Sequence, residues 1–81
     1  MKKVHELKIM PKYFDAVTSG EKTFEVRKKD RDFKVGDCVI LSEFDGKEFT
    51  GRGCVREITY ILDDPEFCKD GYVIFGMRDV R

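Results

Sequence analysis

The sequence predicts a fold of the α+β class that is mainly β: a small, partly closed, five-stranded β-barrel with one short N-terminal helix. Segments of strand length that are alternating or continuously apolar recur along the chain, whereas only residues 11–19 have helical spacing. The pair Asp45-Gly46 between two such segments marks a tight hairpin. Because a flat sheet would leave unpaired edges, five strands in so short a chain favour a barrel with antiparallel pairing.

Length and charge restrict the class of protein. A chain of 81 residues is enough for one domain, which we take to span residues 1–81. Such a domain buries only about 60–65% of the surface of its unfolded chain, so its core must be small. The 16 basic and 16 acidic residues give a formal net charge of zero. Any attraction to nucleic acid must therefore come from a local cluster of cations.

Hydropathy and cysteine spacing argue against a membrane protein, a secreted protein, a disulfide-bonded protein and a zinc protein. The chain has neither an apolar run of membrane-spanning length nor a signal peptide, so we expect a cytoplasmic protein with no membrane partner. Its cysteines, Cys38, Cys54 and Cys68, are odd in number, widely spaced and without a Cys-x-x-Cys motif. This spacing predicts free buried thiols instead of disulfides or a zinc site. We expect no metal, no cofactor and no obligatory protein partner.

The first expected strand covers Val4–Met10, where His5, Leu7 and Ile9 share one face. His5 is the sole histidine of the chain. A lone histidine in phase with apolar residues is more often hydrogen-bonded at the edge of a core than a ligand or a base. We keep His5 as a minor candidate for the ligand-binding site.

A helix is expected over Pro11–Ser19. Its proline suits the first helical turn, and Tyr13, Phe14 and Val17 follow at helical spacing. Gly20 then provides a left-handed stop. We interpret the two aromatic residues as packing residues, and we expect the helix to fix where the next strand begins.

The next strand, expected over residues 22–28, carries the candidate site. Side chains alternate faces along a strand. Three polar side chains therefore share one face and two apolar ones the other: Thr23, Glu25 and Arg27 against Phe24 and Val26. We expect the apolar pair to pack and the polar face, with Lys22 at the strand entrance, to line a cleft, because charges are rarely buried without partners. The alternative is a solvated face whose ion pair is worth less than about 1 kcal/mol.

A mixed cluster of charges follows this strand in the loop of residues 28–32. One interpretation is a basic rim, in which Arg27, Lys28, Lys29 and Arg31 lie close enough to contact a phosphate backbone. The other is a solvated loop that only aids solubility.

The second half of the chain supplies the remaining strands. A turn at Val35–Asp37 leads into an apolar, β-branched strand over Cys38–Phe44, and the return strand opens at Lys47–Phe49. The glycines of Thr50–Gly53 predict a bulge or bend. A long strand over residues 54–62 has an imperfect alternation that a twist or a barrel corner would explain, and a last strand over residues 72–75 is expected to end at Gly76.

Four residues in and just before the candidate strand carry a family resemblance. Gly20, Lys22, Glu25 and Arg27 match the signature Gly-x-Lys-x-x-Glu-x-Arg, so the chain resembles the ASCH domains, relatives of the RNA-binding PUA domains. The turn of residues 33–37 is also similar. Nearly the whole chain resembles a family of short, stand-alone bacterial and phage PUA-like proteins of unassigned function, which open with a segment like His-Glu-Leu-Lys at residues 5–8. The resemblance implies a PUA-like barrel.

Three functions are compatible with these residues. The first is a binding module for RNA or a nucleotide-like ligand, the class that the resemblance implies, in which Lys22 and Arg27 hold phosphate or a base edge and Glu25 orients Arg27. Thr23, His5 and the basic rim complete the candidate ligand-binding set. Another is a structural or protein-interaction domain, in which the signature is an ion-paired network that holds the barrel.

The remaining possible function is that of an enzyme. Some ASCH-like proteins are amidohydrolases of N4-acylated cytidine, and the resemblance implies a lysine at Lys22, a threonine nucleophile three residues later and a downstream glutamate. Here Glu25 stands where the threonine would be, Thr23 is a hydroxyl in another register, and Glu66 is the nearest substitute for the glutamate. If the protein is an enzyme, Lys22 and Glu25 would be the catalytic pair that activates water.

Overall fold

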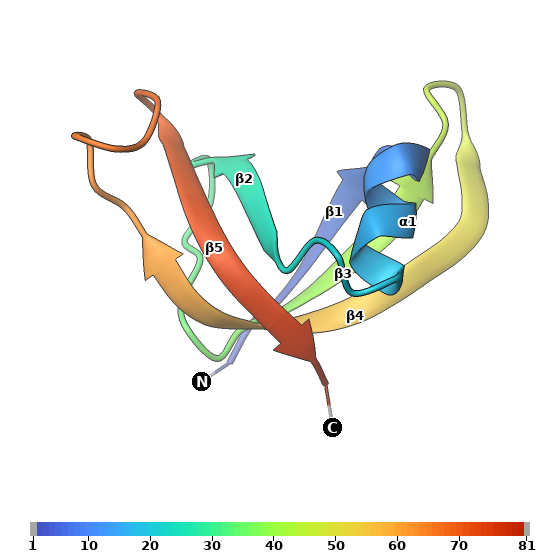
Figure 1. Cartoon of the computed structure of the whole chain (residues 1–81), viewed down its shortest axis with the longest axis horizontal. Helices are drawn as coiled ribbons and strands as arrows, with labels where there is room; N and C mark the ends of the chain where they lie inside the picture. The colour runs from blue at the N-terminus through green and yellow to red at the C-terminus, as the bar shows by residue number, and fades with distance from the viewer. Residues whose placement is uncertain (1, 81) are drawn as a thin grey trace.

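Five strands and one helix make up the protein in a computed structural model that describes residues 2–80. The elements are β1 (Val4–Ile9), α1 (Pro11–Thr18), β2 (Phe24–Lys28), β3 (Cys38–Phe44), β4 (Phe49–Leu62) and β5 (Tyr72–Asp79). The strands form one sheet in the order β1-β3-β4-β5-β2. This sheet curls into a half-barrel, which confirms the expected mainly β fold with one short helix (Figure 1).

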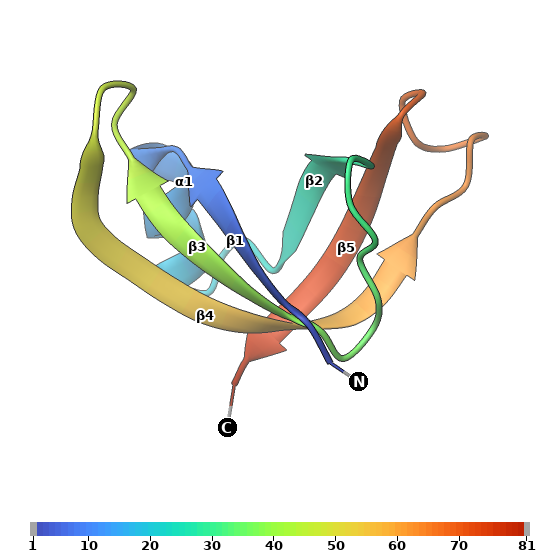
Figure 2. The same ribbon diagram turned by 180° about the vertical axis from the view of Figure 1, so that it is seen from behind.

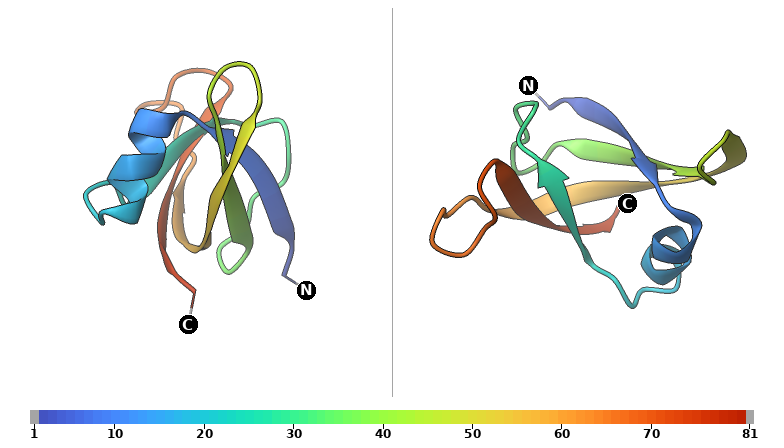
Figure 3. Two further views of the ribbon diagram at one scale, coloured as in Figure 1. Left: turned by 90° about the vertical axis from the view of Figure 1, so that its right-hand side faces the viewer. Right: turned by 90° about the horizontal axis from the view of Figure 1, so that it is seen from above.

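The two walls of the half-barrel share one long strand. β1, β3 and the first half of β4 form one wall, and the second half of β4, β5 and β2 form the other (Figure 2). Seen from above, β1 and β2 lie on opposite sides of the opening (Figure 3). Since these strands are the two ends of the strand order, the opening is where a closed barrel would have its last ladder.

The expectation of purely antiparallel pairing is wrong for one pair of strands. β1 runs parallel to β3, from Val4 opposite Cys38 to Ile9 opposite Glu43, while the other three ladders are antiparallel. A parallel pair needs a long crossover connection, and the segment between β1 and β3 contains both α1 and β2. This crossover returns the chain to the end of the sheet where β1 starts.

Two irregularities allow β4 to bend from one wall to the other. Residues 50–52 lie opposite the single residue Glu43, since Ser42 pairs with Gly53 and Phe44 with Phe49. Thr59 is an extra residue between two paired positions of β4. The predicted bend at the glycines and the corner in residues 54–62 are both bulges of this strand. The end predicted at Gly76 is wrong, because β5 continues to Asp79.

The concave face of the sheet holds the core. Its buried apolar side chains come from every element except β2: Leu7, Ile9, Phe14, Val17, Val39, Leu41, Ile58, Phe75 and Met77. α1 closes the concave side with two of these residues, Phe14 and Val17. No helix within residues 2–80 is long and apolar enough to cross a membrane.

β2 alternates as predicted, but its apolar face is the exposed one. Phe24 and Val26 are exposed on the convex side, so the prediction that they pack is wrong. Glu25 points to the concave side opposite Phe75 and is only 3% exposed. A carboxylate is stable there because cations from the same segment satisfy it.

Candidate functional site

A cavity of about 450 Å³ occupies the opening between β1 and β2. Side chains from the start of α1 and from the signature segment line it, among them Met10, Tyr13, Lys22, Phe24, Glu25 and Arg27. Lys22, Glu25 and Arg27, which the sequence placed around one cleft, therefore do share one. Thr23 is absent from the lining and instead borders a neighbouring cavity at the end of α1.

Glu25 binds two of the cations that line this cavity. Its Oε2 accepts a hydrogen bond from Lys22 Nζ, and its Oε1 accepts one from Arg27 Nε at 2.9 Å. Arg27 Nη2 also lies 2.7 Å from the same Oε1. Both oxygens of the carboxylate are thus engaged by cations of its own segment. The arrangement fixes two positive groups on either side of one buried negative group.

The end of α1 places Lys22. Gly20 has a φ of +87°, a left-handed conformation that favours glycine, and its N–H bonds to the Val17 carbonyl. The Lys22 N–H then bonds to the Ala16 carbonyl at 2.9 Å, which ties the residue to the last turn of the helix. The ammonium of Lys22 also donates to the Phe24 carbonyl at 2.7 Å. The signature glycine and lysine are therefore linked by a helix cap.

Arg27 connects the two edges of the sheet. Its Nη2 donates to the backbone carbonyl of Lys8 in β1 at 2.8 Å. A second cavity of about 360 Å³ continues along the same opening and shares Lys8 and Arg27 with the first. Lys28 and Arg31 line this second cavity. The two cavities together form one groove, which Arg27 crosses.

Aromatic rings border the first cavity on the side of Lys22. The Lys22 ammonium lies 5.0 Å from the centroid of the Phe24 ring and 5.7 Å from that of Tyr13. The interpretation of Tyr13 as a packing residue is wrong, because its side chain is partly exposed and lines the cavity. Its neighbour Phe14 is in the core as predicted. A planar ligand in the cavity would meet both rings.

The other cationic candidates, Lys28, Lys29 and Arg31, do not line the first cavity. Lys29 forms an ion pair with Asp63 at 2.7 Å, and Arg31 lies 3.8 Å from Asp30. Of the predicted basic rim, the structure brings Arg27, Lys28 and Arg31 to the groove.

His5 is buried in the core and not in the groove. Its Nε2 lies 2.8 Å from Asp37 Oδ2, and its ring packs on Phe33. Burial would raise the pKa of Asp37, but hydrogen bonds from His5 and from the backbone N–H groups of Lys3 and Lys34 outweigh it and hold this pKa below its usual value. This pair anchors the start of β1 to the turn before β3, as expected for a hydrogen-bonded histidine at the edge of a core.

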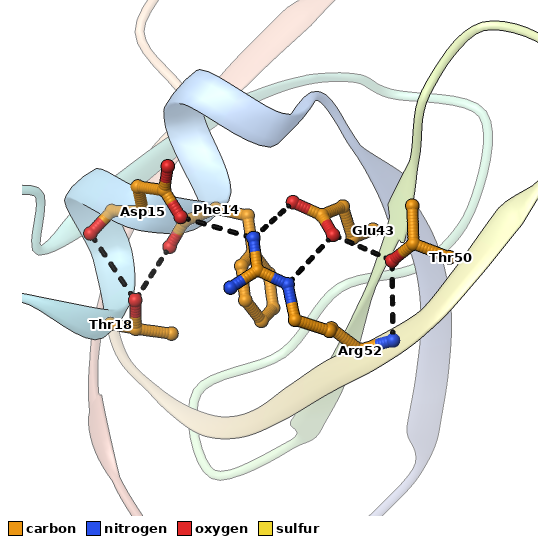
Figure 4. A network of polar contacts seen from close by, with 6 residues as sticks. All are labelled: Phe14, Asp15, Thr18, Glu43, Thr50 and Arg52. Atoms are coloured by element: carbon orange, nitrogen blue, oxygen red, sulfur yellow. Dashed lines mark hydrogen bonds and ion pairs between the residues drawn. The ribbon is translucent and has the colours of Figure 1, made fainter.

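A second buried carboxylate, Glu43, was not recognised from the sequence. It is 3% exposed, and Arg52 donates to both of its oxygens, at 2.9 Å from Nε and 2.7 Å from Nη2 (Figure 4). Thr50 donates to the same carboxylate, and Arg52 also reaches Asp15 of α1. The signal was present, because Glu43 is in phase with Val39 and Leu41 on the buried face of a predicted strand.

The Glu43 network holds α1 against the β3–β4 hairpin. The guanidinium of Arg52 lies 4.8 Å from the centroid of the Phe14 ring in α1. Hydrogen bonds from Arg52 and Thr50 lower the pKa of Glu43, and the same carboxylate raises the pKa of Arg52. The pair therefore stays ionised at neutral pH. Because Tyr13 is on the same helix, this network also positions one wall of the cavity.

The described residues offer little for metal chemistry. No group of three or more His, Cys, Asp or Glu side chains within residues 2–80 has the geometry of a metal site. The three cysteines are free thiols, but the prediction that they are buried holds only for Cys68, because Cys38 and Cys54 are half-buried.

Two comparisons with known proteins find similar sequences. Residues 4–77 match the family described as "Domain of unknown function (DUF3850)". An uncharacterized 12.9 kDa protein in the GpA 3' region of Escherichia phage P2 is 45% identical over 74 residues, which cover 91% of this chain and 67% of that protein. The chain belongs to the DUF3850 family.

Proposed function

We propose that this protein is an RNA-binding module of the ASCH and PUA-like type, with its ligand in the groove between β1 and β2. The observation that carries the proposal is the charge balance of the first cavity. Glu25 is the one acid among the described residues that line it, and both of its oxygens are engaged by Lys22 and Arg27. Lys8 also lines the cavity, so one carboxylate stands against three cations, which leaves a positive site and favours an anionic ligand.

Unused donors in the cavity can contact such a ligand. A guanidinium carries five N–H donors and an ammonium three. The Arg27 bonds within residues 2–80 use Nε and Nη2, and those of Lys22 use two of its donors. The Nη1 group of Arg27 and one N–H of Lys22 are left for phosphate or a base edge. Because Glu25 already orders both side chains, binding would cost little additional side-chain entropy.

The shape of the site favours a chain-like ligand over a single small molecule. The groove continues from the first cavity past Arg27 to a second cavity, whose lining includes the cations of Lys28 and Arg31 and the carboxylates of Glu6 and Asp30. A nucleotide in the first cavity would direct its neighbour along this path, with cations beside successive phosphates. The signature shared with ASCH domains supports the same ligand class.

The amidohydrolase alternative has weaker support. Contact between Lys22 and Glu25 provides a possible acid–base pair in the cavity. However, Thr23 borders another cavity, and the one hydroxyl among the described lining residues is the phenol of Tyr13. An enzyme at this site would have to activate water directly. We therefore propose binding without turnover.

Binding can be measured by fluorescence anisotropy with a labelled pool of short single-stranded RNAs at several salt concentrations. We expect Lys22→Ala to weaken binding and to flatten the dependence of log affinity on log salt by about 0.7 for the lost phosphate contact. Lys47→Ala is the matched control, because this exposed lysine lies in the β3–β4 hairpin. Circular dichroism should show that both variants fold.

Two results would contradict the proposal. One is equal RNA affinity for the wild type and a folded Lys22→Ala variant, which would leave the signature with a structural role. The other is hydrolysis of N4-acetylcytidine by the wild type and not by Lys22→Ala, which would identify the groove as an active site.

A further inference from the structure

The convex face of the β4–β5–β2 wall exposes two aromatic side chains in one cross-strand row. The strand register places Phe24 of β2 and Tyr60 of β4 opposite Gly76 of β5, one on each side. Phe24 is 46% exposed and Tyr60 is 67% exposed. Large aromatic side chains gain free energy by leaving water, so a row of exposed rings indicates an interaction surface.

Gly76 shapes the space between the two rings. Paired residues of neighbouring strands have their side chains on the same face, and Gly76 contributes none. Strands in a sheet lie about 4.8 Å apart, so Phe24 and Tyr60 stand about 10 Å from each other. Between them the hydroxyl of Thr59, the bulged residue of β4, lies 3.2 Å from where a Cβ at Gly76 would be. The next row, Val26–Ile74–Leu62, extends this surface with apolar side chains. The result is a largely apolar surface with one hydroxyl between two rings.

Cations accompany the aromatic side chains on this face. Lys22 Nζ lies 5.0 Å from the centroid of Phe24, and Lys69 Nζ lies 5.1 Å from the centroid of Tyr72. Tyr72 pairs with Lys28 at the end of β2. Rings that offer a face for stacking, with ammonium groups beside them, match a ligand that is planar and carries negative charge.

The row is continuous with the groove. Phe24 belongs to both, because it lines the first cavity and also stands in the convex row. β2 is the last strand of the sheet, so a ligand can pass over its edge without crossing another strand. Lys22 lies at this edge, in contact with Glu25 inside the cavity and near the ring of Phe24.

We propose that Phe24 and Tyr60 stack bases of a single-stranded RNA whose backbone is held at Lys22 and Arg27. This inference rests on the proposed function and extends it, because it makes the ligand single-stranded and longer than one nucleotide. The bases of a duplex are stacked on each other and are not available to the two rings. The RNA leaves the cavity at Phe24, crosses the edge of β2 and places a following base at Tyr60.

The test compares ring removal with charge removal in the whole protein. The probes are a labelled oligouridine of about 12 nucleotides, a duplex of the same length and uridine monophosphate. We expect Tyr60→Ser to weaken oligouridine binding about tenfold, the typical loss of one base–aromatic stack, with an unchanged salt dependence. Tyr60→Phe keeps the ring and should bind like the wild type. Binding of the monophosphate, which reaches only the cavity, should not change.

Phe67→Leu is the matched control, because Phe67 is equally exposed, at 68%, but lies in the loop between β4 and β5. If Tyr60→Ser binds oligouridine like the wild type while Lys22→Ala binds weakly, the stacking face is wrong and the groove stands. If the wild type binds no RNA, both proposals fail. If the wild type sediments as a dimer that Tyr60→Ser dissociates, the row is a contact between copies of this chain and not an RNA surface.

Discussion

The guanidinium of Arg27 in β2 donates a hydrogen bond to the backbone carbonyl of Lys8 in β1 and so links the two ends of an open sheet. The same guanidinium donates a hydrogen bond from Nε to the carboxylate of Glu25. A side chain thus stands where a closed barrel would have a backbone ladder. The groove on either side of this link is the candidate binding site.

Arg27→Gln should destabilise the protein by about 2 kcal/mol, between the values for an exposed and a fully buried ion pair. The variant loses the link to Lys8 and removes one of the two cations that hold Glu25. Urea denaturation measures this change. In the double variant with Glu25→Gln the loss should be smaller than the sum of the two single losses, because the second change removes the carboxylate left without its partner. Additive losses would contradict a shared network.

Acid should destabilise the protein at the carboxylates whose pKa is lowered, which are Glu43, Asp37 and Asp45 among the described residues. The pKa of Glu43 lies below its ordinary 4.5 because of hydrogen bonds from Arg52 and Thr50, and that of Asp37 lies below 3.8. The unfolded chain then binds more protons than the folded protein in this range, so stability is complete above about pH 5 and falls as the pH drops through these values.

Glu43→Gln tests this expectation. The variant should be less stable than the wild type at pH 7, and its stability should fall less between pH 5 and pH 3, since one of the three carboxylates with a lowered pKa is gone. Thermal unfolding at several pH values measures both effects. Glu48→Gln, an exposed change in the adjacent hairpin, is the control. An acid profile of Glu43→Gln that parallels the wild-type profile would refute the role of this carboxylate.

Cys54 should react slowly with alkylating reagents in the folded protein. Burial raises the pKa of its thiol, and the thiolate is the form that reacts. Mass spectrometry after iodoacetamide treatment at pH 8 should show less modification of Cys54 in the native protein than in urea. Equal rates in both conditions would show that the thiol is not protected.

Gly20→Ala should cost about 1 kcal/mol, because the φ of +87° at the end of α1 is strained for any residue with a Cβ. Open space surrounds this position, so the cost is one of backbone conformation and not of packing. Gly20→Asn should recover part of the loss, since asparagine tolerates the left-handed region better than alanine. Chemical denaturation distinguishes the two variants. An unaffected Gly20→Ala protein would mean that the cap does not need glycine.

Much of the architecture was predictable because it depends on local chemistry. The helix over residues 11–18, the strand over residues 38–44, the hairpin at Asp45-Gly46 and the bulge near Gly51 all follow from side-chain period and from residues with special backbone preferences. The parallel pairing of β1 and β3 was not predictable in this way. It depends on where a long crossover returns the chain, which no local pattern encodes.

The site shows the same division between sequence and tertiary structure. The sequence alone determined that Glu25 and Arg27 lie within reach of each other, since they are two residues apart on one face of a strand. Lys22 precedes β2, and its backbone is placed by the cap at the end of α1. Tertiary structure decided which face of β2 is buried, because Glu25 faces inward only where the curled sheet leaves a cavity in which two cations can satisfy it. It also joined Glu43 to Arg52 and Asp15, and Arg27 to the Lys8 carbonyl. Contacts between distant segments depend on the curvature and register of the whole sheet, and these are properties of the packed chain and not of any single segment.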